Sequence, residues 1–157
     1  MSKPEQIQRT REEFARLTDA LLGLNERELT ALGIGDWGVR DVLAHIVGWT
    51  RVDTEIMRRL ARGERPLPEG EDYGTGESRN PGFAEKAAAR SARSVLDELL
   101  VAFDEFVDAA ERGEDNGFAP GRTAQRTMQE SACQHIKEHR IEIETWRKTL
   151  KTGTGVP

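Results

Sequence analysis

The stretch HIKEHRIEIETWR, residues 135–147, decides the fold expected for the whole chain. Along it His135, His139, Ile143 and Trp146 recur at spacings of three and four, which is typical of the inward face of an amphipathic helix. Its two histidines, His135 and His139, stand four residues apart, so both imidazoles leave the same face of that helix. This spacing allows two side chains on one helix to share a metal ion.

Working outward from this stretch, apolar periodicity predicts a helix over 123–151 and three more over 5–24, 38–62 and 83–112. Gly38 is an acceptable N-cap for the second of them. No segment is typical of a strand, and NERELTALGIG near residue 30 fits either a helical turn or a connection. Four long helices predict an all-α four-helix bundle.

The segment GERPLPEGEDYGTGESRNPG, residues 63–82, is rich in glycine and proline and has no helical period. Twenty extended residues can span on the order of 66 Å, whereas a 24-residue helix is about 36 Å long. The segment can therefore return along the whole bundle, so that the second and third helices run parallel. The bundle would then have up-down-down-up topology with a long crossover, and the last residues, 152–157, should be frayed.

Composition narrows the functional classes. The chain has 157 residues, of which 36% are hydrophobic and 32% charged, and its net charge is −5; we expect one domain, 1–157. Because the balance is acidic and no basic stripe stands out, nucleic acid is not expected as a partner. A single cysteine, the lack of an apolar signal core and the lack of a membrane-spanning run predict a soluble cytoplasmic protein that does not enter a membrane.

The third histidine, His45, lies in WGVRDVLAHIVGW, residues 37–49, on the second predicted helix. Two ligands from one helix and a third from a facing helix would form a three-nitrogen site with an open position, typical of a reactive metal centre. The alternative is that His45, His135 and His139 are partly buried residues at the edge of the core with ordinary hydrogen bonds. Helix geometry alone does not decide between these interpretations.

The two stretches together resemble the DinB-like (YfiT-like) family of bacterial four-helix-bundle proteins. The residues that match the family pattern are Trp37, Asp41, His45, His135 and His139. The resemblance implies an up-down-down-up bundle in which the three histidines hold a divalent metal, commonly zinc or nickel. It also implies a homodimer, and relatives include transferases and isomerases that use a low-molecular-weight thiol as cosubstrate.

The leading hypothesis is therefore a metal-dependent thiol S-transferase or hydrolase. Metal coordination lowers the pKa of water or of a thiol, and the resulting nucleophile would attack a small electrophilic substrate. Two alternatives stay open. The chain could be a non-catalytic helical homodimer, or a metal-free self-resistance protein that detoxifies a metabolite with carboxylates in place of the metal.

Two carboxylates are candidates for supporting the histidines, although no catalytic residue is identified from the sequence. Glu142, three residues after His139, is placed to accept a hydrogen bond from a ligand imidazole, or else to pair with a basic residue on the surface. Asp53 lies near the inward stripe of the second helix and could play a similar part, but an exposed position is favoured.

Other conspicuous residues have simpler interpretations. Cys133 is predicted to be a buried, inert thiol. Trp49 and Trp146 should pack in the core, and Trp49, one turn beyond His45, could also wall the site. Glu138 completes an H-x-x-E-H pattern that some metalloproteases share, but few residues follow to supply a third ligand downstream, so a solvated charge is favoured.

Overall fold

The computed structural model describes residues 1–68, 70 and 82–151. Four long helices dominate it: α1 (Lys3–Leu21), α3 (Val39–Ala61), α5 (Ala92–Arg112) and α7 (Gln134–Lys151). The shorter elements are α2 (Glu26–Thr30), β1 (Leu32–Ile34), β2 (Trp37–Gly38), α4 (Phe83–Lys86), the 3-10 helix η2 (Asp115–Phe118), α6 (Thr123–Arg126) and the π-helical η3 (Thr127–Cys133).

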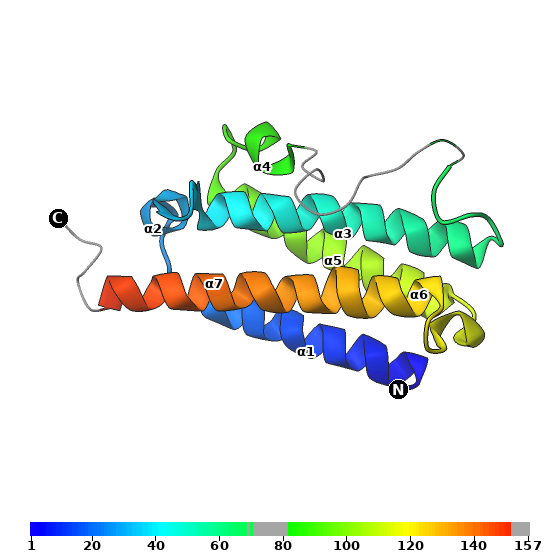
Figure 1. Cartoon of the computed structure of the whole chain (residues 1–157). Helices are drawn as coiled ribbons and strands as arrows, with labels where there is room; N and C mark the ends of the chain where they lie inside the picture. The colour runs from blue at the N-terminus through cyan, green and yellow to red at the C-terminus, as the bar shows by residue number, and fades with distance from the viewer. Residues whose placement is uncertain (69, 71–81, 152–157) are drawn as a thin grey trace.

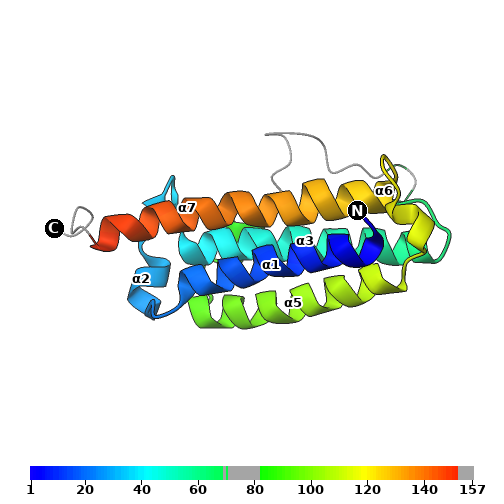
Figure 2. The same cartoon turned by 90° about the horizontal axis from the view of Figure 1, so that it is seen from below.

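The long helices form the predicted bundle. Figure 1 shows α1 and α7 running in one direction and α3 and α5 in the other. The contacts between the long helices pair α1 with α7 and α3 with α5, and Figure 2 shows the four helices from below. The all-α, up-down-down-up prediction is therefore confirmed. Most of the predicted crossover (69 and 71–81) and the predicted frayed tail (152–157) lie outside the described residues.

Local capping explains where two of the helices begin. At α1, the Ser2 hydroxyl accepts from the Glu5 amide, and the Glu5 carboxylate accepts in return from the Ser2 amide. At α3, Gly38 is the N-cap as predicted, and its amide donates to Asp41 Oδ2 at 2.9 Å. A Cβ on Gly38 would lie 2.6 Å from the Ala31 carbonyl oxygen, so only glycine fits here.

The predicted third helix, 83–112, is wrong over its first part. The chain forms α4, turns, and begins α5 only at Ala92, where the Ser91 hydroxyl accepts from the Ser94 amide. Glu26 of α2 caps the same helix end, since its Oε1 accepts from the Ala92 amide at 2.6 Å. These capping groups satisfy amides that a continuous helix would have used internally, which favours a new start.

The expectation that the chain forms no strand is also wrong, because β1 and β2 pair antiparallel in a small hairpin. Leu32 lies opposite Gly38 in this hairpin. The hairpin packs closely on the end of α7: a Cβ on Gly33 would lie 2.7 Å from the indole of Trp146.

The first helix ends at Leu21, three residues earlier than predicted.

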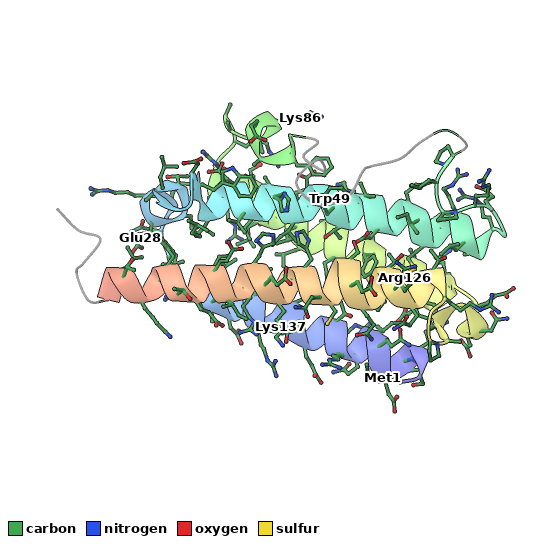
Figure 3. The ribbon with its side chains drawn as sticks, in the orientation of Figure 1. Met1, Glu28, Trp49, Lys86, Arg126 and Lys137 are labelled. Carbon is green, nitrogen blue, oxygen red and sulfur yellow. The ribbon has the colours of Figure 1, made fainter. Side chains whose placement is uncertain are left out.

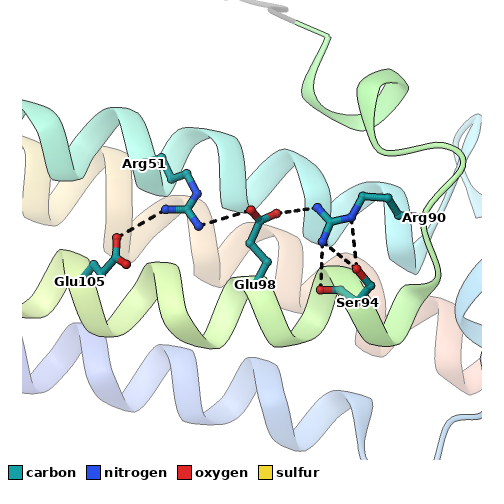
Figure 4. A network of polar contacts seen from close by, with 5 residues as sticks. All are labelled: Arg51, Arg90, Ser94, Glu98 and Glu105. Atoms are coloured by element: carbon teal, nitrogen blue, oxygen red, sulfur yellow. Dashed lines mark hydrogen bonds and ion pairs between the residues drawn. The ribbon is translucent and has the colours of Figure 1, made fainter.

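The bundle has an apolar core, and a polar network lies on the outer edge where α3 meets α5. The fully buried side chains in the core include Leu17, Val39, Val42, Leu43, Val95, Leu99, Met128 and Ile143. On the edge, Arg51 of α3 binds Glu98 at 3.3 Å, and Arg90 binds the same carboxylate at 2.7 Å (Figure 4). The pKa of Glu98 is lowered, mainly by its hydrogen bond to Arg90.

The fourth predicted helix is one continuous rod made of α6, η3 and α7, in which residues 127–133 are π-helical. No glycine or proline marks that segment. Across the described parts of the chain, none of the helices has the length and apolar character needed to span a bilayer.

Candidate metal centre

Three imidazoles meet where α3 faces α7. His45 comes from α3, and His135 and His139 come from α7. The Nε2 atom of His135 lies 3.0 Å from that of His45 and 2.9 Å from that of His139. In the described residues, this trio is the group whose potential ligand atoms all lie within 4.8 Å of one another. The structure thus brings together the three predicted ligands, each half-buried.

The neighbouring side chains hold two of these rings in place. Glu142 Oε1 lies 2.6 Å from His139 Nδ1, so the ring donates its Nδ1 proton to the carboxylate and directs the Nε2 lone pair toward the other histidines. The ring of Trp37 lies 5.2 Å from that of His45, centroid to centroid. The sequence allowed Glu142 either to accept a hydrogen bond from a histidine or to pair with a basic residue on the surface. The structure contains the hydrogen bond with the histidine.

His45 is held in its neutral form. Burial, with a smaller contribution from the nearby His139, lowers the pKa of His45 from 6.5 to about 4, although Glu85 acts in the opposite direction. A neutral imidazole is the form that binds a metal.

A cleft of about 690 Å³ opens onto His45 and His135. One wall is α3 and the other is the rod formed by α6, η3 and α7; Figure 3 labels Trp49 on the first wall and Arg126 on the second. The lining residues beyond the histidines are Trp49, Asp53, Ile56, Thr123, Arg126, Thr127, Glu130, Ser131 and Glu138. The site therefore has the concave access that a small-molecule ligand requires.

Asp53 is not exposed, contrary to the favoured interpretation of the sequence. It is only 3% exposed and lines the cleft. The Ser131 hydroxyl lies 2.8 and 2.9 Å from the two carboxylate oxygens. The sequence did not predict that Ser131 lies at the cleft. Ser131 belongs to η3, and no local sequence signal marks a π-helical segment. Segments of this kind occur frequently at functional sites.

The remaining candidates lie close to their expected places. Cys133 is buried, and burial raises the pKa of its thiol. Trp146 is buried in the core, whereas Trp49 is buried and also lines the cleft. Glu138 is exposed at the cleft and accepts a hydrogen bond from the Gln134 amide group.

Comparison with known proteins gives a family match over most of the chain. The model of the mycothiol maleylpyruvate isomerase N-terminal domain matches residues 7–140. This stretch contains His45, His135 and His139. Among curated proteins, none matches this chain in sequence.

Three solved structures share the fold at 16% sequence identity. The colibactin self-resistance protein ClbS, in complex with double-stranded DNA, has a TM-score of 0.78 over 94% of this chain and 96% of its own. An uncharacterised Escherichia coli UTI89 protein has a TM-score of 0.75 over 96% and 95%. A Streptococcus pneumoniae protein has a TM-score of 0.76 over 94% and 91%.

The ClbS complex corrects one expectation from the sequence. Nucleic acid was excluded as a partner because the net charge is −5 and no basic stripe stands out. A protein of the same fold has nevertheless been crystallised with double-stranded DNA. The exclusion was therefore wrong, because the net charge of a chain does not describe the field at one part of its surface.

Proposed function

This chain belongs to the family of the mycothiol maleylpyruvate isomerase N-terminal domain, within the DinB-like proteins, and from that premise we propose that it is a metal-dependent enzyme. Its metal would be a divalent ion, zinc or nickel, held by His45, His135 and His139. The observation that carries the proposal is the approach of three Nε2 atoms to one point on the wall of a cleft.

The chemistry of the three rings fits a metal ion. Neutral imidazoles present lone pairs, and His139 presents its own at Nε2 because Nδ1 is bonded to Glu142. Zinc–nitrogen bonds of about 2.0–2.1 Å in a tetrahedral site place the nitrogen atoms about 3.3 Å apart. The separations of 3.0 and 2.9 Å from His135 Nε2 to the other two Nε2 atoms approach that value, and the ligand atoms of all three rings lie within 4.8 Å of one another. Imidazole ligands suit zinc and nickel equally.

The reaction we propose is attack by water or a low-molecular-weight thiol on a small electrophilic substrate. Coordination would supply the nucleophile at neutral pH by lowering the pKa of the bound water or thiol. Glu142 keeps the His139 ring in one orientation and one tautomer. Trp49 and Ile56 supply apolar wall to the cleft that would receive the substrate. A cytoplasmic location and a homodimer belong to the same proposal.

The cleft argues for an enzyme over a purely structural helical dimer. A protein that used its histidines only for packing would cover them with side chains. Here His45 and His135 line a space of about 690 Å³, a size within the range of small-molecule sites.

Metal analysis of the purified chain tests the proposal directly. We expect about one zinc or nickel ion per chain in the wild type, and almost none in the double variant His135→Ala, His139→Ala, because a single imidazole holds such ions weakly. Glu138→Gln, which changes an exposed residue between the two ligands, should retain the metal. Equal and low metal content in the wild type and the double variant would overturn the proposal.

The fold shared with ClbS favours a second candidate, a self-resistance protein that detoxifies a metabolite without metal and can contact DNA. Asp53 and Glu130 would supply the carboxylates in the cleft. This candidate predicts detoxifying activity that survives chelator treatment. It also predicts binding to a labelled DNA duplex that weakens as salt is raised. Loss of activity on chelation and recovery with zinc would favour the first candidate.

A further inference from the structure

The hairpin of β1 and β2 bridges the two helices that carry the three histidines. On one side it continues directly into α3, because Gly38 ends β2 and is also the N-cap of α3. On the other side Gly33 of β1 lies against Trp146 of α7. Figure 1 shows the hairpin beside α2, at the end of the bundle where α3 begins and α7 ends. The hairpin is therefore placed to set how closely α7 approaches α3.

Direct packing between α3 and α7 is slight. α3 packs far more extensively on α5 than on α7, and the cleft of about 690 Å³ lies between α3 and the rod that contains α7. Trp146 follows His139 by seven residues on the same face of α7, or about 10 Å along the helix axis. A displacement of α7 at Trp146 would therefore also displace His139.

The contact between Gly33 and Trp146 leaves no room for a side chain. A Cβ on Gly33 would lie 2.7 Å from Cδ1 and Nε1 of the indole, whereas atoms of this kind normally meet at about 3.5–4.0 Å. The indole has little freedom to turn away, because Trp146 is only 6% exposed and belongs to the hydrophobic core. A larger residue at position 33 would thus move α7 or the hairpin by about 1 Å.

Either movement would change the geometry of the histidines. If α7 moved, the ring of His139 would shift relative to that of His45, which lies 5.1 Å away between centroids. If the hairpin moved, Trp37 of β2 would leave its place 5.2 Å from the His45 ring. Metal–ligand distances hold to within about 0.2 Å, so a displacement of about 1 Å between the ligands is large on this scale.

We propose that Gly33 is a positioning residue for the metal centre. Because it lets β1 contact the indole of Trp146, it holds α7 at the distance from α3 at which the three imidazoles converge. The inference rests on the proposed function, since the group that is positioned is taken to be a metal ion bound from both helices. Gly33 acts through Trp146 and the hairpin, and it is not among the proposed ligands.

A double-mutant cycle on the zinc affinity of the full chain tests the inference. Gly33→Ala should raise the zinc Kd about tenfold, because the ligands on the two helices no longer meet at bonding distance. Trp146→Leu shortens the opposing side chain and makes room for the added Cβ. In the Trp146→Leu background, Gly33→Ala should therefore change the Kd by less than about threefold. Competition with a chromogenic chelator measures all four proteins.

Gly113→Ala is the matched control. Gly113 is the C-cap of α5, at the end of the bundle away from the hairpin (Figure 1), and a Cβ there would lie 3.3 Å from the Ala110 carbonyl oxygen. Its zinc Kd should equal that of the wild type, whatever its effect on the free energy of unfolding. The inference is overturned by wild-type zinc affinity in Gly33→Ala, by an undiminished effect in the Trp146→Leu background, or by an equal loss of affinity in Gly113→Ala.

Trp37→Leu gives an independent variant should Gly33→Ala fail to fold. It removes the ring through which the hairpin contacts His45, and it adds no atom at Gly33. We expect its zinc Kd to rise, because the hairpin would then be coupled to α3 alone and not to the His45 ring. An unchanged Kd in Trp37→Leu would equally count against the inference.

NMR of chelated protein separates this inference from the proposed function. The rings of His45 and His139 are close enough to give a nuclear Overhauser effect in the wild type. This effect should weaken in Gly33→Ala and stay unchanged in Gly113→Ala. The same result in a chain that takes up no zinc would refute the metal-dependent enzyme and support the spacing role of Gly33. A chain that binds zinc equally well with glycine and with alanine at position 33 would do the reverse.

Discussion

The face of α7 that packs on α1 and the face that meets α3 both carry polar side chains at helical spacing, yet they are built differently. Toward α1, Arg140 binds Glu13 at 3.1 Å and Glu144 at 3.0 Å, and Arg16 binds Glu13 at 3.0 Å. Each charge there has a partner of opposite sign within the chain. Toward α3, three imidazole nitrogens face one another instead.

This difference separates a structural network from a candidate site. Two arginines and two glutamates balance each other and need no external group. The three imidazoles that converge through their Nε2 atoms have no group of opposite charge among them, and a single ring proton cannot be donated to two neighbouring rings at once. A cation at their common point would satisfy every lone pair. The two faces should therefore respond differently to mutation, to metal and to pH.

The largest effect is expected on the α1 face. Arg140→Met removes the cation between Glu13 and Glu144 and leaves the 8%-exposed side chain of Glu13 with Arg16 as its ion-pair partner. We expect a loss of about 3 kcal/mol in the free energy of unfolding, because the buried carboxylate of Glu13 loses its buried cationic partner and keeps only the largely exposed Arg16. Urea denaturation measures this. Adding Glu13→Gln should recover part of the loss, and a stability unchanged by Arg140→Met would show that this face is not a balanced network.

On the α3 face, the effect should come from added metal. At a free zinc concentration of 100 times Kd, we expect the wild type to gain about 2.7 kcal/mol in its free energy of unfolding, because zinc binds the folded state. His135→Ala should gain almost nothing, since His135 Nε2 is the atom closest to both other rings. Urea denaturation with and without zinc measures both proteins. If zinc raised the free energy of unfolding equally in the wild type and in His135→Ala, the ion would bind elsewhere on the chain.

Glu142 should have an intermediate effect that is confined to metal affinity. Glu142→Gln removes the carboxylate that accepts from His139 Nδ1, and we expect about a tenfold increase in the zinc Kd, or about 1.4 kcal/mol. Competition with a chromogenic chelator measures the Kd. Glu144→Gln is the matched control, because Glu144 binds Arg140 on the other face. If the zinc Kd rose equally in the two variants, the effect would come from the loss of one negative charge and not from the hydrogen bond to His139.

The elements that sequence predicts well are those encoded by local periodicity. The apolar stripes predicted all four long helices, and the length of the segment 63–82 allowed α3 and α5 to run parallel. The three imidazoles depend less on local sequence. The four-residue spacing pairs His135 with His139, whereas helix geometry alone did not decide whether His45 lies beside them. Whether they hold a metal stays a prediction.

What the sequence did not predict depends on contacts between distant residues. α5 begins late because Glu26, 66 positions upstream, caps Ala92. The hairpin lies against α7 because Gly33 leaves room for the indole of Trp146. Asp53 is buried because a π-helical segment presents Ser131 to it. None of these contacts leaves a periodic signal, so propensity and spacing could not have found them.

The smallest effect concerns pH, and again it should appear on the α3 face. His45 has a pKa of about 4 in the folded chain against 6.5 for an ordinary histidine, chiefly because it is buried. Between these values the unfolded chain binds more protons, so stability rises with pH in this window and falls as the pH is lowered toward 4. From pH 7 to pH 5.5, His45 should contribute a loss of about 1 kcal/mol in metal-free protein.

Urea denaturation of chelated wild type and of His45→Gln at pH 7 and pH 5.5 isolates this contribution, because the other titrating groups are common to both proteins. The wild type should lose about 1 kcal/mol more than the variant over this interval. Identical losses would mean that His45 is not held neutral by burial. A larger loss in the wild type than in His45→Gln would place this sensitivity to protons on the side of the bundle where α3 meets α7.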